Sequence, residues 1–209
     1  MNKQNTNVTK EKKLDLAVMA NDAQSMSGFD KLDISRDTAI PYISILQTSS
    51  PQVNPSKPEY IDSAKAGNLF NTVTQEVFAD VEVIPVFYSL KYVEWKPREQ
   101  GGGFIASHDA DSGVLGQCTR DPMTNKQVLP NGNHIVQTAY HYVLILTGDG
   151  YQNAVISMSS SQLKKSRRWN SLMLSQKLKG PSGMFTPPTY AFTYKLSTVS
   201  ESNDRGSWF

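Results

Sequence analysis

The stretch VEVIPVFYSLKYVEWKP, residues 81–97, carries the clearest strand pattern in the chain, and it decides the fold we expect. Two sets of side chains alternate in it: Ile84, Val86, Tyr88, Leu90 and Tyr92, and between them Val83, Pro85, Phe87, Ser89 and Lys91. Alternation with a period of two residues is typical of a β-strand. Because both sets are largely apolar or aromatic, we expect a curved sheet with one face in the core and the other in contact with something else.

Strand and turn signals continue on both sides of this stretch. Residues 138–158 predict a hairpin that turns around 148–150, and residues 40–47 and 189–199 predict single strands. Residues 104–137 are rich in loop signals, with hairpin turns expected at 121–126 and 130–133. One substantial helix is expected over residues 160–178, ended by Gly180-Pro181. The sum is an α+β fold, mainly an antiparallel β-sheet or a partly open, OB-like barrel with one helix.

Length and composition limit the class of protein. The chain has 209 residues and a single cysteine, Cys118, which fits a reducing cytoplasm. No apolar run approaches the roughly 18 residues of a membrane span, and the start has no secretory signal, so we expect a cytoplasmic protein without a membrane partner. Residues 1–35 are polar and predict a flexible arm, with a short helix at 14–20, ahead of one domain at 36–209.

Basic residues concentrate in SQLKKSRRWNS, residues 161–171, although the formal net charge of the chain is only +2. After Asp149 the next carboxylate is Glu201. On a helix, the four cations and the adjacent indole share one side: Lys164, Lys165, Arg167, Arg168 and Trp169. Cations beside an aromatic ring suit single-stranded nucleic acid, whose phosphates are charged and whose bases can stack. The alternative is a solvated basic face with Trp169 in the core.

A second group of aromatic and basic residues follows the strand stretch: Lys91, Tyr92, Trp95, Lys96 and Arg98. In a regular strand, Phe87, Lys91 and Trp95 project from one face, and Tyr88, Tyr92 and Lys96 from the other. Only one face can meet a ligand, and core packing is an alternative explanation of these side chains.

Signatures of catalysis are sparse, and we expect a protein that is not an enzyme and needs no cofactor or metal. The three histidines show no metal-ligand spacing, and His141 reads as a core residue. The best enzymatic alternative is a Mg²⁺-dependent nuclease with Asp80, Glu94 and Lys96, but one strand would separate the two carboxylates by roughly 45 Å. A third alternative is a phage structural or adaptor protein whose aromatic residues form a subunit interface.

Three segments carry a resemblance to a known group: residues 81–104, SSSQLKKSRRWNSL at 159–172, and ESNDRGSWF at 201–209. Over residues 38–209 the chain resembles tailed-phage early proteins that bind single-stranded DNA, including those that bring a phage RNA polymerase to exposed DNA. The resemblance implies a non-catalytic, oligomeric accessory of replication or transcription in an infected bacterium. Its partners would be single-stranded DNA and a phage RNA polymerase or replication proteins. The acidic tail of many such proteins is not seen at 207–209.

The leading hypothesis is therefore largely sequence-independent binding of single-stranded DNA. The backbone would be held by Lys91, Lys96, Arg98, Lys164, Lys165, Arg167 and Arg168. Trp95, Trp169 and Tyr92 would stack on bases. A preference between DNA and RNA depends on contacts at the 2′ position, which the sequence does not reveal.

Overall fold

The computed structural model describes residues 28–148, 150–204 and 206–209. Residues 1–27, with most of the expected arm and the helix expected at 14–20, lie outside the described residues. The chain divides into two units between Ala39 and Ile40, four residues beyond the expected boundary. The described part of the first unit contains the short helix α2 (Ile34–Asp37), whose first turn is capped by the side chain of Asp33 accepting from the Ser35 N–H.

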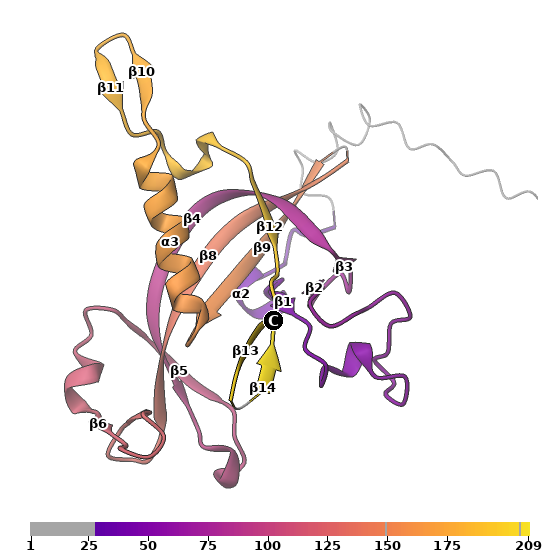
Figure 1. The fold of residues 1–209 in the computed structure, drawn as a ribbon, viewed down its shortest axis with the longest axis vertical. Coiled ribbons are helices and arrows are strands. Elements are labelled where there is room, and N and C mark those ends of the chain that lie inside the picture. Colours follow the sequence, from indigo (N-terminus) through magenta and orange to yellow (C-terminus); the bar gives the residue numbers. More distant parts are fainter. Residues whose placement is uncertain (1–27, 149, 205) are drawn as a thin grey trace, which may run out of the picture. The chain divides into compact units, whose positions relative to one another are not determined.

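The second unit is built on a curved, seven-stranded antiparallel sheet (Figure 1). Its strands are β12 (Tyr194–Ser197), β4 (Asp80–Trp95), β8 (His134–Thr147), β7 (Gln127–Val128) and β6 (Thr119–Arg120) in this order, with β5 (Phe104–Asp109) on β4 and β9 (Gly150–Ser159) on β8. The expected hairpin at 138–158 is the β8–β9 pair. Among the described residues the pairing does not close into a barrel. The α+β expectation is confirmed.

A β-bulge interrupts the strand that decides the fold. Pro85 faces Val143 on β8, but Phe87 faces Tyr142, so Val86 is the extra residue. Because side chains alternate along a strand, the extra residue shifts the pattern by one position. The single alternation expected over residues 83–92 is therefore wrong. Val83 and Pro85 share a face with Tyr88, whereas Phe87 points to the opposite face.

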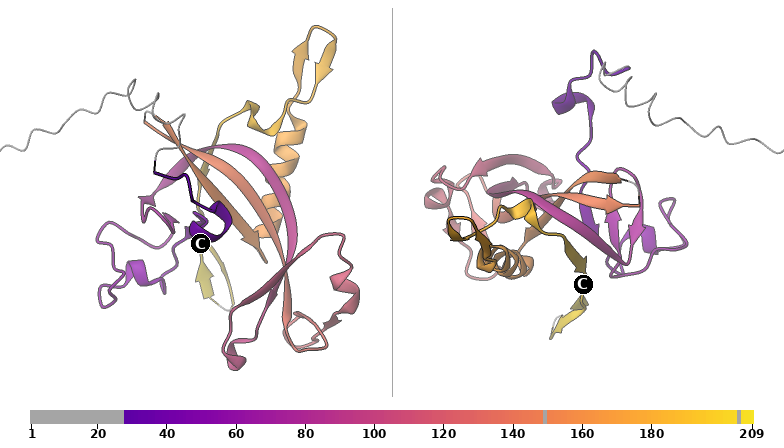
Figure 2. Two further views of the ribbon diagram at one scale, coloured as in Figure 1. Left: turned by 180° about the vertical axis from the view of Figure 1, so that it is seen from behind. Right: turned by 90° about the horizontal axis from the view of Figure 1, so that it is seen from above.

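One face of the sheet is covered by helix α3 (Gln162–Ser175), which packs against β8 and β9 (Figure 2). Ser166, Trp169 and Met173 are its buried residues, at the i, i+3 and i+7 spacing of a single helix face. They complete a core with strand residues such as Val83 and Ile145. The sheet and α3 together hold the largest buried cluster of the described chain.

The expected end of the helix is wrong by three residues. The helix ends at Ser175, where the Gln176 N–H still bonds to the Met173 carbonyl. Gly180 and Pro181 instead belong to a hairpin of β10 (Leu178–Gly180) and β11 (Gly183–Phe185), which projects beyond the end of α3 in Figure 1. Gly183 has φ +117°, a left-handed conformation that suits glycine in this turn.

The lower part of the same sheet face is covered by the segment between β5 and β8. Val114, Leu129 and Ile135 form a second core, and Tyr92 and Cys118 pack against it. The expected turns at 121–126 and 130–133 are confirmed as the β6–β7 and β7–β8 connections. Strand β5 lies in the part that we expected to be mostly loop.

The remaining elements of the second unit lie beside β9 and β12. A three-stranded sheet contains β1 (Ile43–Ile45), β2 (Leu69–Asn71) and β3 (Val77–Phe78), and β1 is preceded by a parallel bridge from Tyr42 to Val155 on β9. A hairpin of β13 (Glu201–Asn203) and β14 (Gly206–Trp208) follows β12. Single 3₁₀ turns are η1 (Pro51–Val53), η2 (Arg98–Gln100), η3 (Val114–Gln117) and η4 (Thr189–Ala191). None of the described helices has the length and apolar character that crossing a bilayer requires.

Candidate nucleic-acid interface

The outer side of α3 carries exposed cations. Lys164, Arg167 and Arg168 are all exposed, and they lie about 100° to 160° around the helix axis from the buried Ser166. Among the described residues none of these three side chains forms an ion pair. The three therefore form a basic surface, and we call these three residues the helix basic face. Glu201 lies close enough to Lys164 that the charge of Lys164 adds, after Lys165, to the lowering of the Glu201 pKa.

Lys165 lies on the flank of the helix and has an acidic partner. Its Nζ is 2.7 Å from the Glu201 Oε1, and the hydrogen bond from Lys165 is the main cause that lowers the pKa of Glu201. Glu201 is the first carboxylate after Asp149 in the sequence. It lies on β13, which the fold places next to α3. Of the four helix cations expected to act together, three form no ion pair with any residue that the structure describes.

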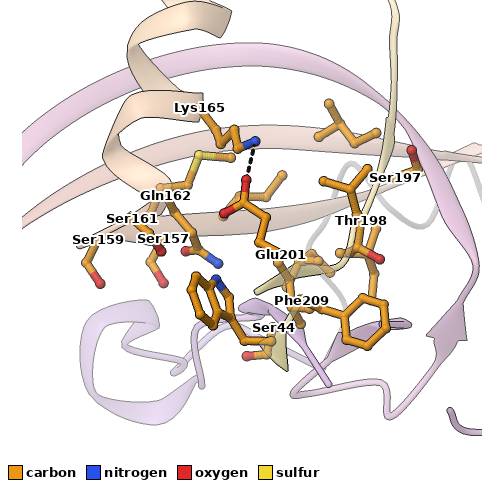
Figure 3. A pocket seen from close by; sticks show the side chains of 18 of the residues that line it. Ser44, Ser157, Ser159, Ser161, Gln162, Lys165, Ser197, Thr198, Glu201 and Phe209 are labelled. Carbon is orange, nitrogen blue, oxygen red and sulfur yellow. Dashed lines mark ion pairs between the residues drawn. The ribbon is translucent and has the colours of Figure 1, made fainter. Parts of the chain in front are cut away.

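A cavity of about 470 Å³ opens beside the Lys165 flank (Figure 3). It lies between α3 and the strands β1, β9, β12 and β13. Small polar side chains line it in unusual number: Ser44, Ser157, Ser159, Ser161, Gln162, Ser197 and Thr198. Apolar side chains, among them Ile45, Met158 and Trp208, complete the walls. Figure 3 shows the Lys165–Glu201 pair bridging from the helix to the C-terminal segment.

Trp169 has a different role from the one expected. Its side chain is only 7% exposed, its indole stacks on His141 with 4.6 Å between ring centroids, and Tyr194 meets it edge-on at 5.9 Å. Base stacking requires an accessible ring face, which this tryptophan does not offer. The expected stacking role of Trp169 is wrong, and the alternative that places it in the core is correct.

His141 is a core residue, as expected. It is 1% exposed, and its Nε2 lies 2.8 Å from the Ser166 Oγ. Burial lowers the pKa of His141 to about 4, because desolvation penalises the charged imidazolium. The ring is thus neutral at physiological pH and serves packing.

Lys91 and Tyr92, two of the expected site residues on β4, make contacts within the protein. Lys91 forms an ion pair with Asp109 on β5, and this hydrogen bond raises the pKa of Lys91. Tyr92 is half-buried against the second core. Part of the Tyr92 ring remains accessible, so its expected stacking role stays a prediction.

The end of β4 is more open. Trp95 is 41% exposed and meets the exposed Phe104 edge-to-face at 6.0 Å. Lys96 and Arg98 are exposed and form no ion pair within the described part of the chain. Trp95 thus remains available for stacking.

The two sets of expected site residues do not form one surface. Lys91 and Trp95 share the sheet face of Phe87, whereas Tyr88 faces His141, which stacks on Trp169 of α3. The helix therefore covers the face opposite to Lys91 and Trp95. The helix basic face therefore stands by itself beside the cavity, apart from Lys91 and Trp95.

Sequence reasoning placed Phe87 on one face with Lys91 and Trp95, but it did not identify Tyr142 as the aromatic neighbour of Phe87 on that face. Phe87 is 62% and Tyr142 40% exposed, and their ring centroids are 5.6 Å apart. Burial raises the pKa of nearby Tyr42 and Tyr140, and the charge of Tyr142 adds to both effects. The alternation Tyr140-His141-Tyr142 in β8 was the available signal, because it places both tyrosines opposite the core histidine.

Glu94, one of the two carboxylates that the nuclease alternative would use, is buried. It is 6% exposed, accepts hydrogen bonds from the amides of Asn133 (2.5 Å) and Asn131 (3.3 Å), and lies 2.9 Å from the His108 Nε2. These donors lower the pKa of Glu94. Asp80, at the other end of the sixteen-residue strand, pairs instead with Lys195 at 3.1 Å. In the described part of the chain no three potential ligands converge on a metal position.

Comparison with known proteins gives a single kind of match. A family model described as Pam3 phage gp34-like protein matches residues 9–209. No curated protein and no solved structure matches the chain.

Proposed function

The chain belongs to the Pam3 phage gp34-like family, and for this phage protein we propose a non-catalytic role in binding single-stranded DNA. The observation that carries the proposal is the helix basic face, three exposed cations on one side of α3 that form no ion pair with the residues the structure describes. Unpaired cations at this spacing attract consecutive phosphates and release condensed counterions when they bind.

The cavity beside α3 supports a single strand as the ligand rather than a duplex. A duplex keeps its bases stacked inside, whereas a single strand can turn bases toward a protein surface. Hydroxyl and amide side chains such as Ser161 and Gln162 line this cavity next to Lys165. Backbone contacts and base contacts are therefore available side by side.

The biological role that we propose follows from this activity. The protein covers exposed DNA in the cytoplasm of an infected bacterium and presents it for phage replication or transcription, with a phage RNA polymerase or replication proteins as partners. Self-association along the strand belongs to the same proposal, since cooperative binding is the norm for proteins of this activity. Trp95, Lys96 and Arg98 form a separate surface that a longer strand or a partner could contact.

The salt dependence of binding tests the proposal. Replacing Lys164, Arg167 and Arg168 with glutamine should lower the slope of log K against log salt by about 2 for oligo(dT), at roughly 0.7 for each lost phosphate contact. The matched control replaces the exposed Lys57, Lys65 and Lys126, which removes the same charge elsewhere and should leave the slope unchanged. Equal slopes for the helix variant and the wild-type protein would refute the proposal.

A second candidate function, a structural or adaptor role, is favoured by the exposed aromatic face. Phe87, Tyr142 and Tyr151 are 62%, 40% and 65% exposed, and contiguous apolar surface on a monomer often marks a protein interface. If this role is the main one, the protein will assemble without DNA, Phe87→Lys will prevent assembly, and oligo(dT) will produce no mobility shift. Sedimentation velocity with and without oligo(dT) distinguishes the two candidates.

A further inference from the structure

The cavity beside α3 has walls of two chemical kinds. Neutral hydroxyl and amide groups line one part of it, and aliphatic and aromatic side chains line the rest. The only charged side chains among its described lining residues are those of Lys165 and Glu201, and these two neutralise each other. Such a site suits an uncharged, planar molecule with apolar faces and polar edges. Its volume of about 470 Å³ falls in the range of roughly 300–1,000 Å³ that is usual for small-molecule sites.

The position of the cavity connects it to the helix basic face. Lys165 belongs both to the cavity lining and to the same two turns of α3 as Lys164 and Arg168. A phosphate held by these cations would place its attached nucleotide near the cavity opening. Resting on the proposed function, we infer that the cavity receives a nucleobase of the bound strand.

The polar groups of the lining fit a base whose identity varies. Hydroxyl groups of residues such as Ser157 and Ser44 rotate, and each can donate or accept. The side-chain amide of Gln162 can also do both. Their combination accepts the differing edges of the four bases, while Met158 and Trp208 contact the ring faces. The site therefore binds bases with little preference for sequence.

The Lys165–Glu201 ion pair adapts the opening to the ligand. The Lys165 side chain is 51% exposed and the Glu201 side chain 39%, and exposed ion pairs of this kind are weak. When a nucleotide arrives, Lys165 exchanges the Glu201 carboxylate for the nucleotide's phosphate. Lys165 thereby joins the helix basic face only in the bound state.

Two oligomers of equal length and equal charge test the inference: oligo(dT), and an abasic strand with tetrahydrofuran in place of each nucleoside. The wild-type protein should bind oligo(dT) about tenfold more tightly, a difference in the range of a single stacked base. Ser157→Phe fills the cavity from β9 and should reduce this difference to less than threefold. Binding of the abasic strand and its salt slope should stay as in the wild-type protein.

Two further variants make the result specific. Ser44→Phe fills the same cavity from β1, so it replaces Ser157→Phe should that variant fail to fold. Ser107→Phe makes the same substitution on an exposed position of β5, outside the cavity, and should keep the full difference.

The outcomes separate this inference from the proposed function. Equal affinity of the wild-type protein for both oligomers, or a difference that survives both cavity-filling variants, overturns the nucleobase site and leaves phosphate binding by the helix intact. Failure of the wild-type protein to bind either oligomer overturns the proposed function, and the nucleobase site with it.

Discussion

His141 on β8 and Trp169 on α3 stack with 4.6 Å between their ring centroids and 26° between their planes. The contact joins α3 to the centre of the sheet. Both side chains are buried, and the Ser166 hydroxyl meets the Nε2 of the same imidazole at 2.8 Å. The position of α3, and with it the orientation of the helix basic face, therefore depends on a histidine that must remain uncharged.

Stability should fall as the pH drops from about 6.5 toward 4. The folded pKa of His141 is about 4, below the ordinary value of 6.5, so the unfolded chain binds the extra proton in this interval. The contribution is present above pH 6.5 and is lost progressively below it. Denaturant titrations at pH 7 and pH 5 measure the change. Glu94, with its lowered pKa, affects stability only at pH values below about 4.5.

A double variant isolates this histidine. Replacing His141 with Phe and Ser166 with Ala removes both members of the hydrogen bond, so no buried polar group is left without a partner. The difference in unfolding free energy between pH 7 and pH 5 should then shrink. If the variant and the wild-type protein lose stability in parallel, the imidazole is not the titrating group.

Removing the Trp169 side chain should cost the fold far more than removing that of Trp95. Trp169→Ala empties a core site, and truncations of buried aromatic residues typically cost about 3–5 kcal/mol. Trp95 is 41% exposed, and Trp95→Ala should cost less than about 2 kcal/mol. Urea unfolding of both variants provides the comparison. Similar losses would mean that Trp169 does not hold α3 on the sheet.

Glu201→Gln should strengthen the binding of single-stranded DNA. The substitution frees Lys165 from its 2.7 Å ion pair and removes a negative charge near the cations, so affinity for oligo(dT) should rise about threefold to tenfold. Glu59→Gln changes the net charge equally at an exposed position and should have little effect. Fluorescence anisotropy at fixed salt measures both. In a Lys165→Gln background the gain from Glu201→Gln should largely disappear; a gain of the same size there would exclude exchange at Lys165.

Glu94→Ala should loosen the β7–β8 turn. It removes the carboxylate that accepts from the amides of Asn131 and Asn133, and a hydrogen bond to a charged group contributes about 1.5–3 kcal/mol. We expect a loss of about 2 kcal/mol or more in unfolding free energy and faster hydrogen exchange over residues 129–133. Glu82→Ala, on an exposed position of the same strand, is the control. Unchanged exchange in the turn would show that Glu94 does not fix it.

The sequence predicted those parts of the fold that depend on local patterns. The β8–β9 hairpin and the turn at 121–126 follow from residues close together in the chain, and so does the presence of α3. The burial of Trp169 was also visible locally, since Ser166, Trp169 and Met173 have the spacing of one helix face. We nevertheless expected Trp169 to be exposed with the cations, because Lys165 lies next to Trp169 on the helix wheel.

Contacts between distant residues could not be predicted. Glu94 accepts hydrogen bonds from Asn131 and Asn133, which lie 37 and 39 residues further along the chain. Glu201 forms an ion pair with Lys165, 36 residues before it. The bulge at Val86 escaped for another reason. Apolar residues occupy both phases of the strand around it, so a shift of one position leaves the apparent pattern unchanged. Consequently the sequence did not show that Val83 and Pro85 share a face with Tyr88.

The extra residue at Val86 makes β4 sensitive to its length in a way that its composition does not reveal. Val83 and Pro85 share the interior face with Tyr88 and Tyr92 because Val86 is left out of the pairing, so deleting Val86 would keep all four side chains on that face. Substitutions in this strand can be absorbed one at a time, whereas deleting a paired residue such as Tyr88 would turn neighbouring side chains to the opposite face. We expect chains that share this fold to vary in which residue stands at the bulge, and to keep the count of residues on either side of it.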